Sequence, residues 1–62
     1  MEKILRVRRW GELRYFVALE KENGELVDYV HGYPLDRKDI AETADMTNVP
    51  EDQWDEFLGY AD

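Results

Sequence analysis

The stretch that decides the fold is residues 17–29, VALEKENGELVDY, in which two apolar runs typical of strands flank an Asn-Gly pair. The pair admits either a two-residue turn or a type I turn that leaves Gly24 left-handed in a bulge. The bulged turn places Leu19 opposite Val27, whereas the two-residue turn places Leu19 opposite Asp28, a poorer cross-strand partner. We therefore predict a hairpin closed by the bulged turn, with Lys21 opposite Glu25.

Three runs rich in Val, Tyr, Phe and Leu are typical of strands, at residues 3 to 9, 13 to 21 and 25 to 31. Short connections favour an antiparallel meander. With Trp10-Gly11-Glu12 as a three-residue loop, Val7 is expected opposite Tyr15. The same register places Leu5 opposite Val17.

One face of this meander is clearly apolar and the other is half apolar, which is too apolar to remain bare. The apolar residues expected on that second face are Ile4, Phe16, Leu26 and Val30. Either a helix covers it or two copies of the chain pack sheet to sheet, and the sequence alone leaves both open.

After Gly32-Tyr33-Pro34 the period of the apolar residues becomes helical. Asp36 suits an N-cap, which predicts a helix over residues 37 to 44. A second helix over residues 50 to 58 is predicted after Pro50 and is stopped by Gly59. Its apolar stripe consists of Trp54, Phe57, Leu58 and Ala61. The predicted fold is therefore α+β, a three-stranded antiparallel meander followed by two short helices, in one small domain over residues 1–62.

The composition excludes several functions. The 62 residues contain no cysteine and no serine, so a thiol nucleophile, a disulfide scaffold and a Cys-based zinc site are ruled out. His31 lacks a nucleophile partner, and we expect it to lie beside Tyr15 or Tyr33. The acids have neither the spacing of a calcium loop nor a cleft for paired carboxylates. We expect no enzyme activity, no metal and no cofactor.

The charge is unevenly distributed. Residues 1–14 have a net charge of +3 and residues 15–62 one of −10, and from Asp39 onward there are eight acids and no Lys or Arg. Such a chain is repelled by phosphate backbones and attracted to basic surfaces, including the groove of a nucleic-acid enzyme. We also expect a cytoplasmic protein without a membrane span, because no apolar run approaches about 20 residues.

A competing hypothesis is a module that binds single-stranded RNA or DNA through its basic residues and an aromatic side chain. Those residues are Arg6, Arg8, Arg9, Arg14 and Trp10. The simpler interpretation is that the arginines pair with the chain's own acids and keep an edge strand polar. A folded domain without a partner is the third possibility.

Residues 22–36, ENGELVDYVHGYPLD, resemble part of the short phage-encoded uracil-DNA glycosylase inhibitors of Bacillus phages. Both have an acidic glycine turn, a tyrosine-rich strand with a late histidine, and an Asp that opens a helix. The resemblance implies a dimeric DNA mimic that encloses an apolar residue of the enzyme in a pocket. It implies that Glu25, Asp28 and Asp39 supply charge and that Tyr29, Tyr33 and Ile40 line the pocket.

We therefore predict a phage protein that blocks a nucleic-acid enzyme in the host cytoplasm, with uracil-DNA glycosylase as first target and a CRISPR or restriction nuclease as the alternative. A homodimer is possible, and direct nucleic-acid or membrane binding is not expected. The predicted partner-binding residues are Glu25, Asp28, Tyr29, Tyr33, Asp39, Ile40, Glu42, Asp45, Asp52, Asp55 and Glu56.

Overall fold

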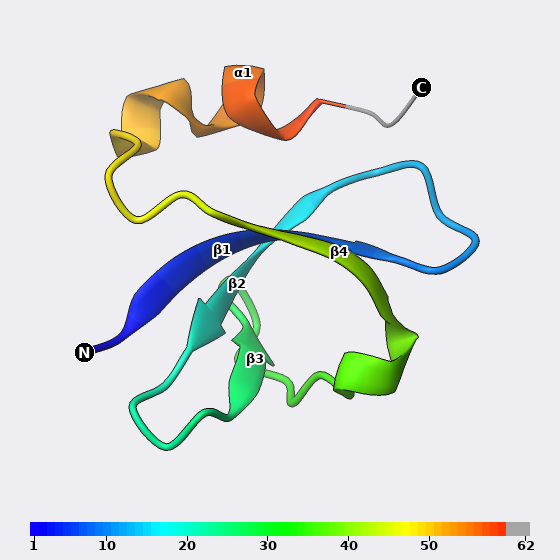
Figure 1. The fold of residues 1–62 in the computed structure, drawn as a ribbon. Coiled ribbons are helices and arrows are strands. Elements are labelled where there is room, and N and C mark those ends of the chain that lie inside the picture. Colours follow the sequence, from blue (N-terminus) through cyan, green and yellow to red (C-terminus); the bar gives the residue numbers. More distant parts are fainter. Residues whose placement is uncertain (60–62) are drawn as a thin grey trace.

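In a computed structural model, residues 1–59 are described and form a four-stranded antiparallel sheet with one short α-helix (Figure 1). The order of the strands is β3-β2-β1-β4. Their bounds are β1 Lys3–Arg9, β2 Phe16–Glu20, β3 Leu26–Asp28 and β4 Ile40–Asp45. The predicted α+β class is confirmed, but the predicted set of three strands and two helices is wrong in detail.

The β2–β3 hairpin has the predicted bulged turn. Gly24 has a φ of 87°, and the backbone N–H of Lys21 donates to the carbonyl of Glu25 at 2.8 Å. Leu19 lies opposite Val27 as expected. The left-handed backbone of Gly24 is what allows this turn, because a side chain at that φ would be strained.

β3 is shorter than predicted, because it ends at Asp28 instead of residue 31. The Asp28 carboxylate accepts hydrogen bonds from the backbone N–H groups of Val30 and His31, at 2.8 and 3.0 Å. This local turn competes with the strand. The chain then reverses, and the N–H of Leu35 donates to the carbonyl of Leu26 at 2.8 Å.

The predicted register between β1 and β2 is wrong by one residue, because Val7 lies opposite Phe16 and Leu5 opposite Ala18. β2 reads Phe-Val-Ala-Leu and is apolar on both faces, so its alternation does not select one register. One face of the sheet holds the core cluster, consisting of Leu5, Val7, Ala18 and Leu26, with Phe16, Leu35 and Ile40 packed against it.

The other face of the sheet carries the buried side chains of Val17 and Val27. The C-terminal part of the chain lies over this face. There the chain continues from β4 through Met46, which is 1% exposed, to a 3-10 turn η2, Glu51–Gln53, and helix α1, Trp54–Leu58. Figure 1 shows η2 and α1 lying along one side of the sheet. The predicted grouping of Ile4, Phe16, Leu26 and Val30 on one second face is wrong, because Leu26 and Phe16 belong to the side of the core cluster. The helix, one of the two covers that the sequence left open, lies over the face that carries Val17 and Val27.

The predicted helix over residues 37 to 44 is wrong. Asp36 does cap a turn, accepting a hydrogen bond from the N–H of Lys38 at 2.9 Å, but the turn is the single 3-10 turn η1, Arg37–Asp39. The chain then enters β4, which pairs with β1. Helix-forming Ala and Glu residues yield here to tertiary pairing, which satisfies the outer backbone groups of β1. β1 is consequently a central strand and not an edge strand.

The C-terminal helix lies where it was predicted, although its first turn is 3-10. Trp54 fixes it to the body of the protein: the indole Nε1 donates to the carbonyl of Val49 at 3.0 Å, and its ring meets Tyr29 edge to face at 5.1 Å. Gly59 ends the helix with a φ of 57°. Ala61 of the predicted stripe lies outside the described residues. Within residues 1–59 no helix has the length and apolarity that a bilayer crossing requires.

Candidate partner-binding surface

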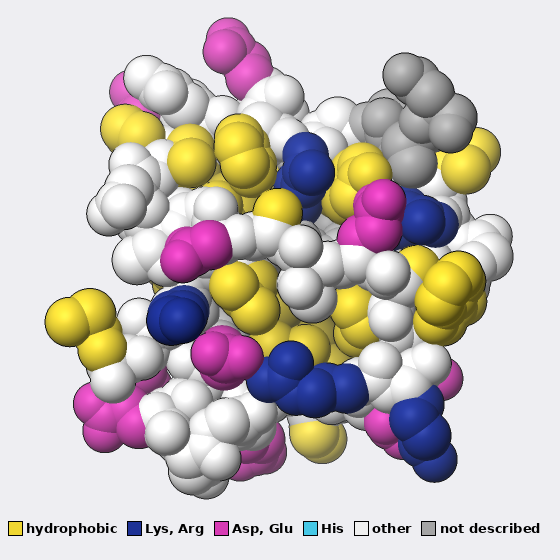
Figure 2. Space-filling model, viewed as in Figure 1, with side chains coloured by type: hydrophobic (Ala, Val, Ile, Leu, Met, Phe, Trp, Pro, Cys, Tyr) yellow, Lys and Arg dark blue, Asp and Glu magenta, His cyan; other side chains and the backbone are white. Residues whose placement is uncertain are grey.

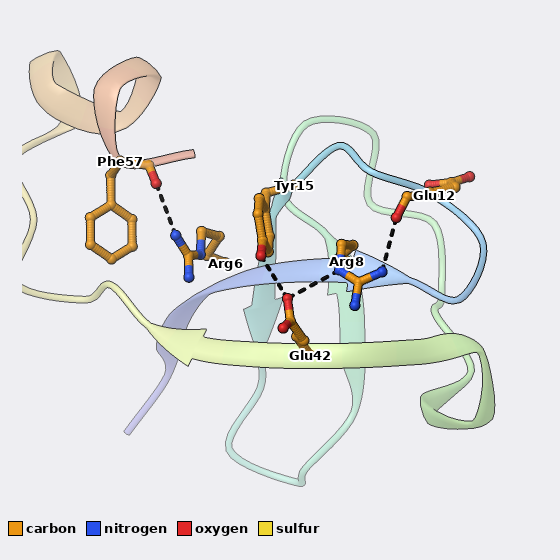
Figure 3. Close-up of polar contacts among 6 residues, drawn as sticks. All are labelled: Arg6, Arg8, Glu12, Tyr15, Glu42 and Phe57. Carbon is orange, nitrogen blue, oxygen red and sulfur yellow. Dashed lines mark hydrogen bonds and ion pairs between the residues drawn. The ribbon is translucent and has the colours of Figure 1, made fainter. Parts of the chain in front are cut away.

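Arg6 joins the sheet to helix α1. Its guanidinium carbon lies 4.2 Å from the ring centre of Tyr15 and 4.9 Å from that of Phe57, and Nη1 donates to the Phe57 carbonyl at 3.1 Å (Figure 3). Within residues 1–59 its Nε is buried without a hydrogen-bond partner, so the charge is held mainly by the two rings and the end of the helix. Arg6 therefore acts as a structural clamp.

Arg8 and Glu42 form the centre of a second cluster. Arg8 Nε lies 3.1 Å from Glu42 Oε2, the Tyr15 hydroxyl donates to the same oxygen at 2.7 Å, and Arg8 Nη1 donates to the Glu12 carbonyl at 3.0 Å (Figure 3). The hydrogen bond from Tyr15, followed by that from Arg8, lowers the pKa of Glu42. The bond to Glu42 likewise raises the pKa of Tyr15. Glu42, which the sequence assigned to partner binding, is thus held within the fold.

Arg9 is also engaged by the chain itself. Its guanidinium carbon lies 4.6 Å from the ring centre of Phe16, and its Nη1 lies 3.8 Å from a carboxylate oxygen of Glu12. Arg8 and Arg9 therefore pair with the protein's own acids, and β1 is hydrogen-bonded on both sides. This arrangement differs from that of an RNA-binding sheet, which presents its basic and aromatic side chains on an open face.

Three other predicted site acids are held by local contacts. Desolvation raises the pKa of Asp28, but the N–H donors of His31 and Val30 outweigh it, so this pKa is lowered overall. The Thr47 hydroxyl donates to Asp45 Oδ1 at 2.6 Å and lowers the pKa of Asp45. Glu25 lies 3.9 Å from the ammonium of Lys21. These acids lie at the ends of β3 and β4 and in the β2–β3 turn.

The acids of η2 and α1 have a different environment. Among residues 1–59 their side chains have no ion pair or hydrogen bond, and all are exposed: Glu51, Asp52, Asp55 and Glu56. We call residues 51–56 the C-terminal acidic segment. Asp39, in η1, is likewise exposed and unpaired within the described residues. In Figure 2 acidic side chains stand out along the side formed by η2, whereas over the sheet they are interspersed with Lys and Arg.

The turn after β3 carries exposed aromatic and apolar side chains, one of which contacts this segment. Tyr29 is 42% exposed and contacts Trp54, and Val30 is 78% exposed. Tyr33 is 66% exposed and stacks on His31 with ring centres 5.5 Å apart, which confirms the position predicted for His31. The structure thus brings Tyr29 next to the C-terminal acidic segment.

The apolar pocket that the resemblance implied is not assembled as expected. Ile40 packs against the core cluster, whereas Tyr29 contacts α1 on the opposite side of the sheet. A different hollow of about 400 Å³ lies beside the C-terminal acidic segment, and its lining is Asn48, Val49, Pro50, Gln53, Glu56 and Phe57. Sequence reasoning missed it, because Asn48 and Pro50 signalled only the start of a helix.

No three His, Asp or Glu side chains within residues 1–59 come together as a set of metal ligands. Comparison of the chain with protein-family models, with curated proteins and with solved structures finds no match. The chemistry that the surface offers is therefore that of unpaired carboxylates beside exposed aromatic rings and a shallow hollow with Val49, Pro50 and Phe57 in its lining.

Proposed function

We propose that this protein is an acidic, non-enzymatic inhibitor that occupies the basic nucleic-acid site of a host enzyme. The observation that carries the proposal is the contrast between the two kinds of charge. The three arginines of β1 contact other residues of the same chain, whereas the carboxylates of the C-terminal acidic segment have no hydrogen-bond or ion-pair partner in residues 1–59. A net charge of −7 steers such a surface toward a basic groove.

The apolar groups near the acids support the same function. Charge alone gives fast but poorly selective association, and tight interfaces add a few buried apolar or aromatic anchors. Tyr29 is exposed beside α1, Val30 is exposed in the same turn as Tyr29, and the hollow lined by Val49, Pro50 and Phe57 can receive a side chain of the partner. In this proposal the hollow replaces the pocket that included Ile40.

The first target that we propose is a bacterial uracil-DNA glycosylase, in keeping with the resemblance of residues 22–36 to phage inhibitors of that enzyme. The inhibitor would act in the cytoplasm of the host of a phage. A CRISPR or restriction nuclease is the alternative target, because such enzymes also bind nucleic acid in basic grooves.

The test is a titration of glycosylase activity with this protein at low and at moderate salt. Stoichiometric inhibition that weakens as salt rises supports both the function and the target. If inhibition is absent at a large molar excess, glycosylase is excluded, and the same titration is repeated with nucleases.

A gel shift with single-stranded DNA and RNA checks the competing hypothesis. We expect no shift at physiological salt, because Arg6, Arg8 and Arg9 are engaged and the chain is acidic overall. A tight complex with either nucleic acid would contradict the proposed function.

A further inference from the structure

The hollow beside the C-terminal acidic segment is bounded by a turn that hydrogen bonds fix in place. The N–H of Val49 donates to the carbonyl of Met46 at 3.0 Å, and the indole N–H of Trp54 donates to the carbonyl of Val49 at 3.0 Å. The N–H of Gln53 donates to the carbonyl of Pro50 at 2.9 Å. The hollow, of about 400 Å³, is therefore formed before any partner binds, and its size suits a small ligand or a single side chain.

The lining of this hollow combines apolar and polar side chains. Its apolar residues are Val49, Pro50 and Phe57, and its polar residues are Asn48, Gln53 and Glu56. Within residues 1–59 none of the three polar side chains has a hydrogen bond or an ion pair. They offer one carboxylate and two amide oxygens as acceptors. An occupant that suits this lining has an apolar part and several hydrogen-bond donors.

The charge around the hollow is negative. Residues 46–59 contain four acids and neither Lys nor Arg. The guanidinium of Arg6 contacts the ring of Phe57, but Arg6 does not line the hollow. A cationic occupant is therefore attracted to this site and an anionic one is repelled.

We propose that the hollow is a receptor for one arginine side chain of the target's basic groove. The guanidinium pairs with the carboxylate of Glu56, and the aliphatic stem lies against Val49 and Pro50. The five N–H donors of a guanidinium are enough to reach the amide oxygens of Asn48 and Gln53 as well. An arginine that binds a phosphate of the nucleic acid would thereby be occupied. The identity of the occupant rests on the proposed function, whereas the affinity of the hollow for arginine does not.

Other side chains match the lining less well. An apolar side chain, which the resemblance to glycosylase inhibitors implies, would remove water from Asn48, Gln53 and Glu56 without replacing their hydrogen bonds, and this costs free energy. A lysine brings the same charge but only three donors on a compact ammonium, and it cannot form the two parallel bonds of a guanidinium with a carboxylate. Arginine alone supplies the stem, the charge and the number of donors.

The test uses the whole chain and a small probe in place of the target. The probe is arginine with its amino group acetylated and its carboxyl group amidated, so that the guanidinium is its only charge. NMR spectra of the isotope-labelled protein are recorded as the probe is added at low salt. We expect saturable shifts confined to the residues that line the hollow, including the side-chain amides of Asn48 and Gln53. The dissociation constant should be millimolar, because a single exposed ion pair is weak.

Two further probes separate charge from shape. The citrulline derivative has nearly the shape of the arginine probe but no charge, and it should give no saturable shift at the hollow. The lysine derivative has the charge without the planar group, and it should bind more weakly than the arginine probe.

Substitutions then locate the site. Glu56→Gln should weaken binding of the arginine probe about fivefold. Glu51→Gln removes the same charge from the same segment, outside the lining, and should bind as the wild type does. Gln53→Glu adds a second carboxylate to the lining and should tighten binding about threefold. Circular dichroism of each variant verifies that it folds.

Three results would overturn the proposal: no saturable shift at the hollow with the arginine probe, equal shifts with the citrulline derivative, or equal weakening by Glu51→Gln and Glu56→Gln. Each is distinguishable from failure of the proposed function. A wild type that inhibits the glycosylase without binding the probe contradicts the arginine receptor alone. A wild type that binds the probe at the hollow but inhibits no nucleic-acid enzyme supports the receptor and contradicts the proposed function.

Discussion

The basic strand β1 and the C-terminal acidic segment are opposite in charge, and they differ even more in what their charges contact. In β1, Arg6 is stacked between two rings, Arg8 pairs with Glu42, and Arg9 lies over Phe16. In residues 51–56 the acids have no partner within the described chain, and only Trp54 faces inward. The arginines of β1 therefore stabilise the fold, whereas the acids of residues 51–56 are available to bind a partner.

This difference has a physical basis in side-chain chemistry. An arginine can bury its aliphatic stem and present a flat guanidinium to aromatic rings, so it contributes to packing. Short exposed carboxylates contribute little to stability when they stand alone. Acids retained at such positions are therefore better explained by solvation or by binding than by folding.

Trp54→Ala should have the largest effect on stability. Trp54 is the residue of the C-terminal acidic segment that packs against the rest of the protein, so this variant separates its contribution from that of the neighbouring acids. The indole contacts Tyr29 and donates to the Val49 carbonyl, so its removal should cost about 3 kcal/mol. Urea unfolding followed by circular dichroism measures the loss. Trp54→Phe, which keeps a ring but loses the N–H donor, should cost about 1 kcal/mol. A loss below about 1 kcal/mol for Trp54→Ala would show that α1 is not held by this residue.

Arg6→Met should cost about 2 kcal/mol, because it keeps the apolar stem but removes the cation from the Tyr15 and Phe57 rings and the bond to the Phe57 carbonyl. The same urea experiment measures it. Lys38→Met removes a cation outside the clamp, with a side chain that is 87% exposed, and serves as the comparison for lost charge. An Arg6→Met protein as stable as the wild type would break the contrast between the two regions, since Arg6 would then be dispensable to the fold.

Acid unfolding separates a carboxylate that serves the fold from one that does not. The pKa of Glu42 is lowered in the folded state, so the unfolded chain binds more protons below about pH 4.5 and stability is lost as the pH falls through this lowered pKa. In Glu42→Gln the urea concentration at the midpoint of unfolding should therefore fall less steeply than in the wild type as the pH is lowered. We call the part of this plot below about pH 4.5 the acid limb.

The same variant should affect the alkaline side, because the pKa of Tyr15 is raised by its bond to Glu42. That stability is present below pH 10 and is lost as the pH rises through the raised pKa. Absorbance titration of the tyrosines detects the change. Glu51→Gln, whose carboxylate has no partner in residues 1–59, should reproduce the wild-type acid limb. An acid limb that Glu42→Gln leaves unchanged would speak against the Arg8–Glu42–Tyr15 cluster.

Neutralising the C-terminal acidic segment should have the smallest effect on stability. We expect the combined substitution Glu51→Gln, Asp52→Asn, Asp55→Asn and Glu56→Gln to change the free energy of unfolding by less than about 0.5 kcal/mol, as is usual for unpaired surface side chains. Urea unfolding measures this change as well. A loss comparable to that of Arg6→Met would show that these acids support the fold, and the contrast would fail.

The parts of the fold that sequence reasoning predicted are those determined by local chemistry. Gly24 specifies the bulged turn, Asp36 caps a turn, and Gly59 ends the last helix, each through its own backbone or side chain. The errors lie where a distant segment decides. Residues 40–45 have the composition of a helix and become a strand because β1 offers an unpaired edge. The register of β2 is ambiguous because both of its faces are apolar.

The candidate site was predicted in part for the same reason. The excess of acids near the C-terminus is visible in the sequence, but whether each acid is paired depends on contacts between distant residues. Glu42 lies 34 residues from Arg8, and Tyr15 lies 27 residues from Glu42. The placement of Tyr29 beside Trp54, and of Ile40 on the opposite side of the sheet, also depends on how the chain folds back.

The most direct test of the account compares two charge-neutralised proteins as inhibitors of a bacterial uracil-DNA glycosylase. One is the combined substitution of the C-terminal acidic segment. The other removes the same number of negative charges from residues 2–22, by Glu2→Gln, Glu12→Gln, Glu20→Gln and Glu22→Gln. We predict that the wild type and the second variant inhibit stoichiometrically, whereas the first loses inhibition at least tenfold. Equal loss in both variants, or no inhibition by the wild type, would contradict the assignment of the C-terminal acidic segment to this target.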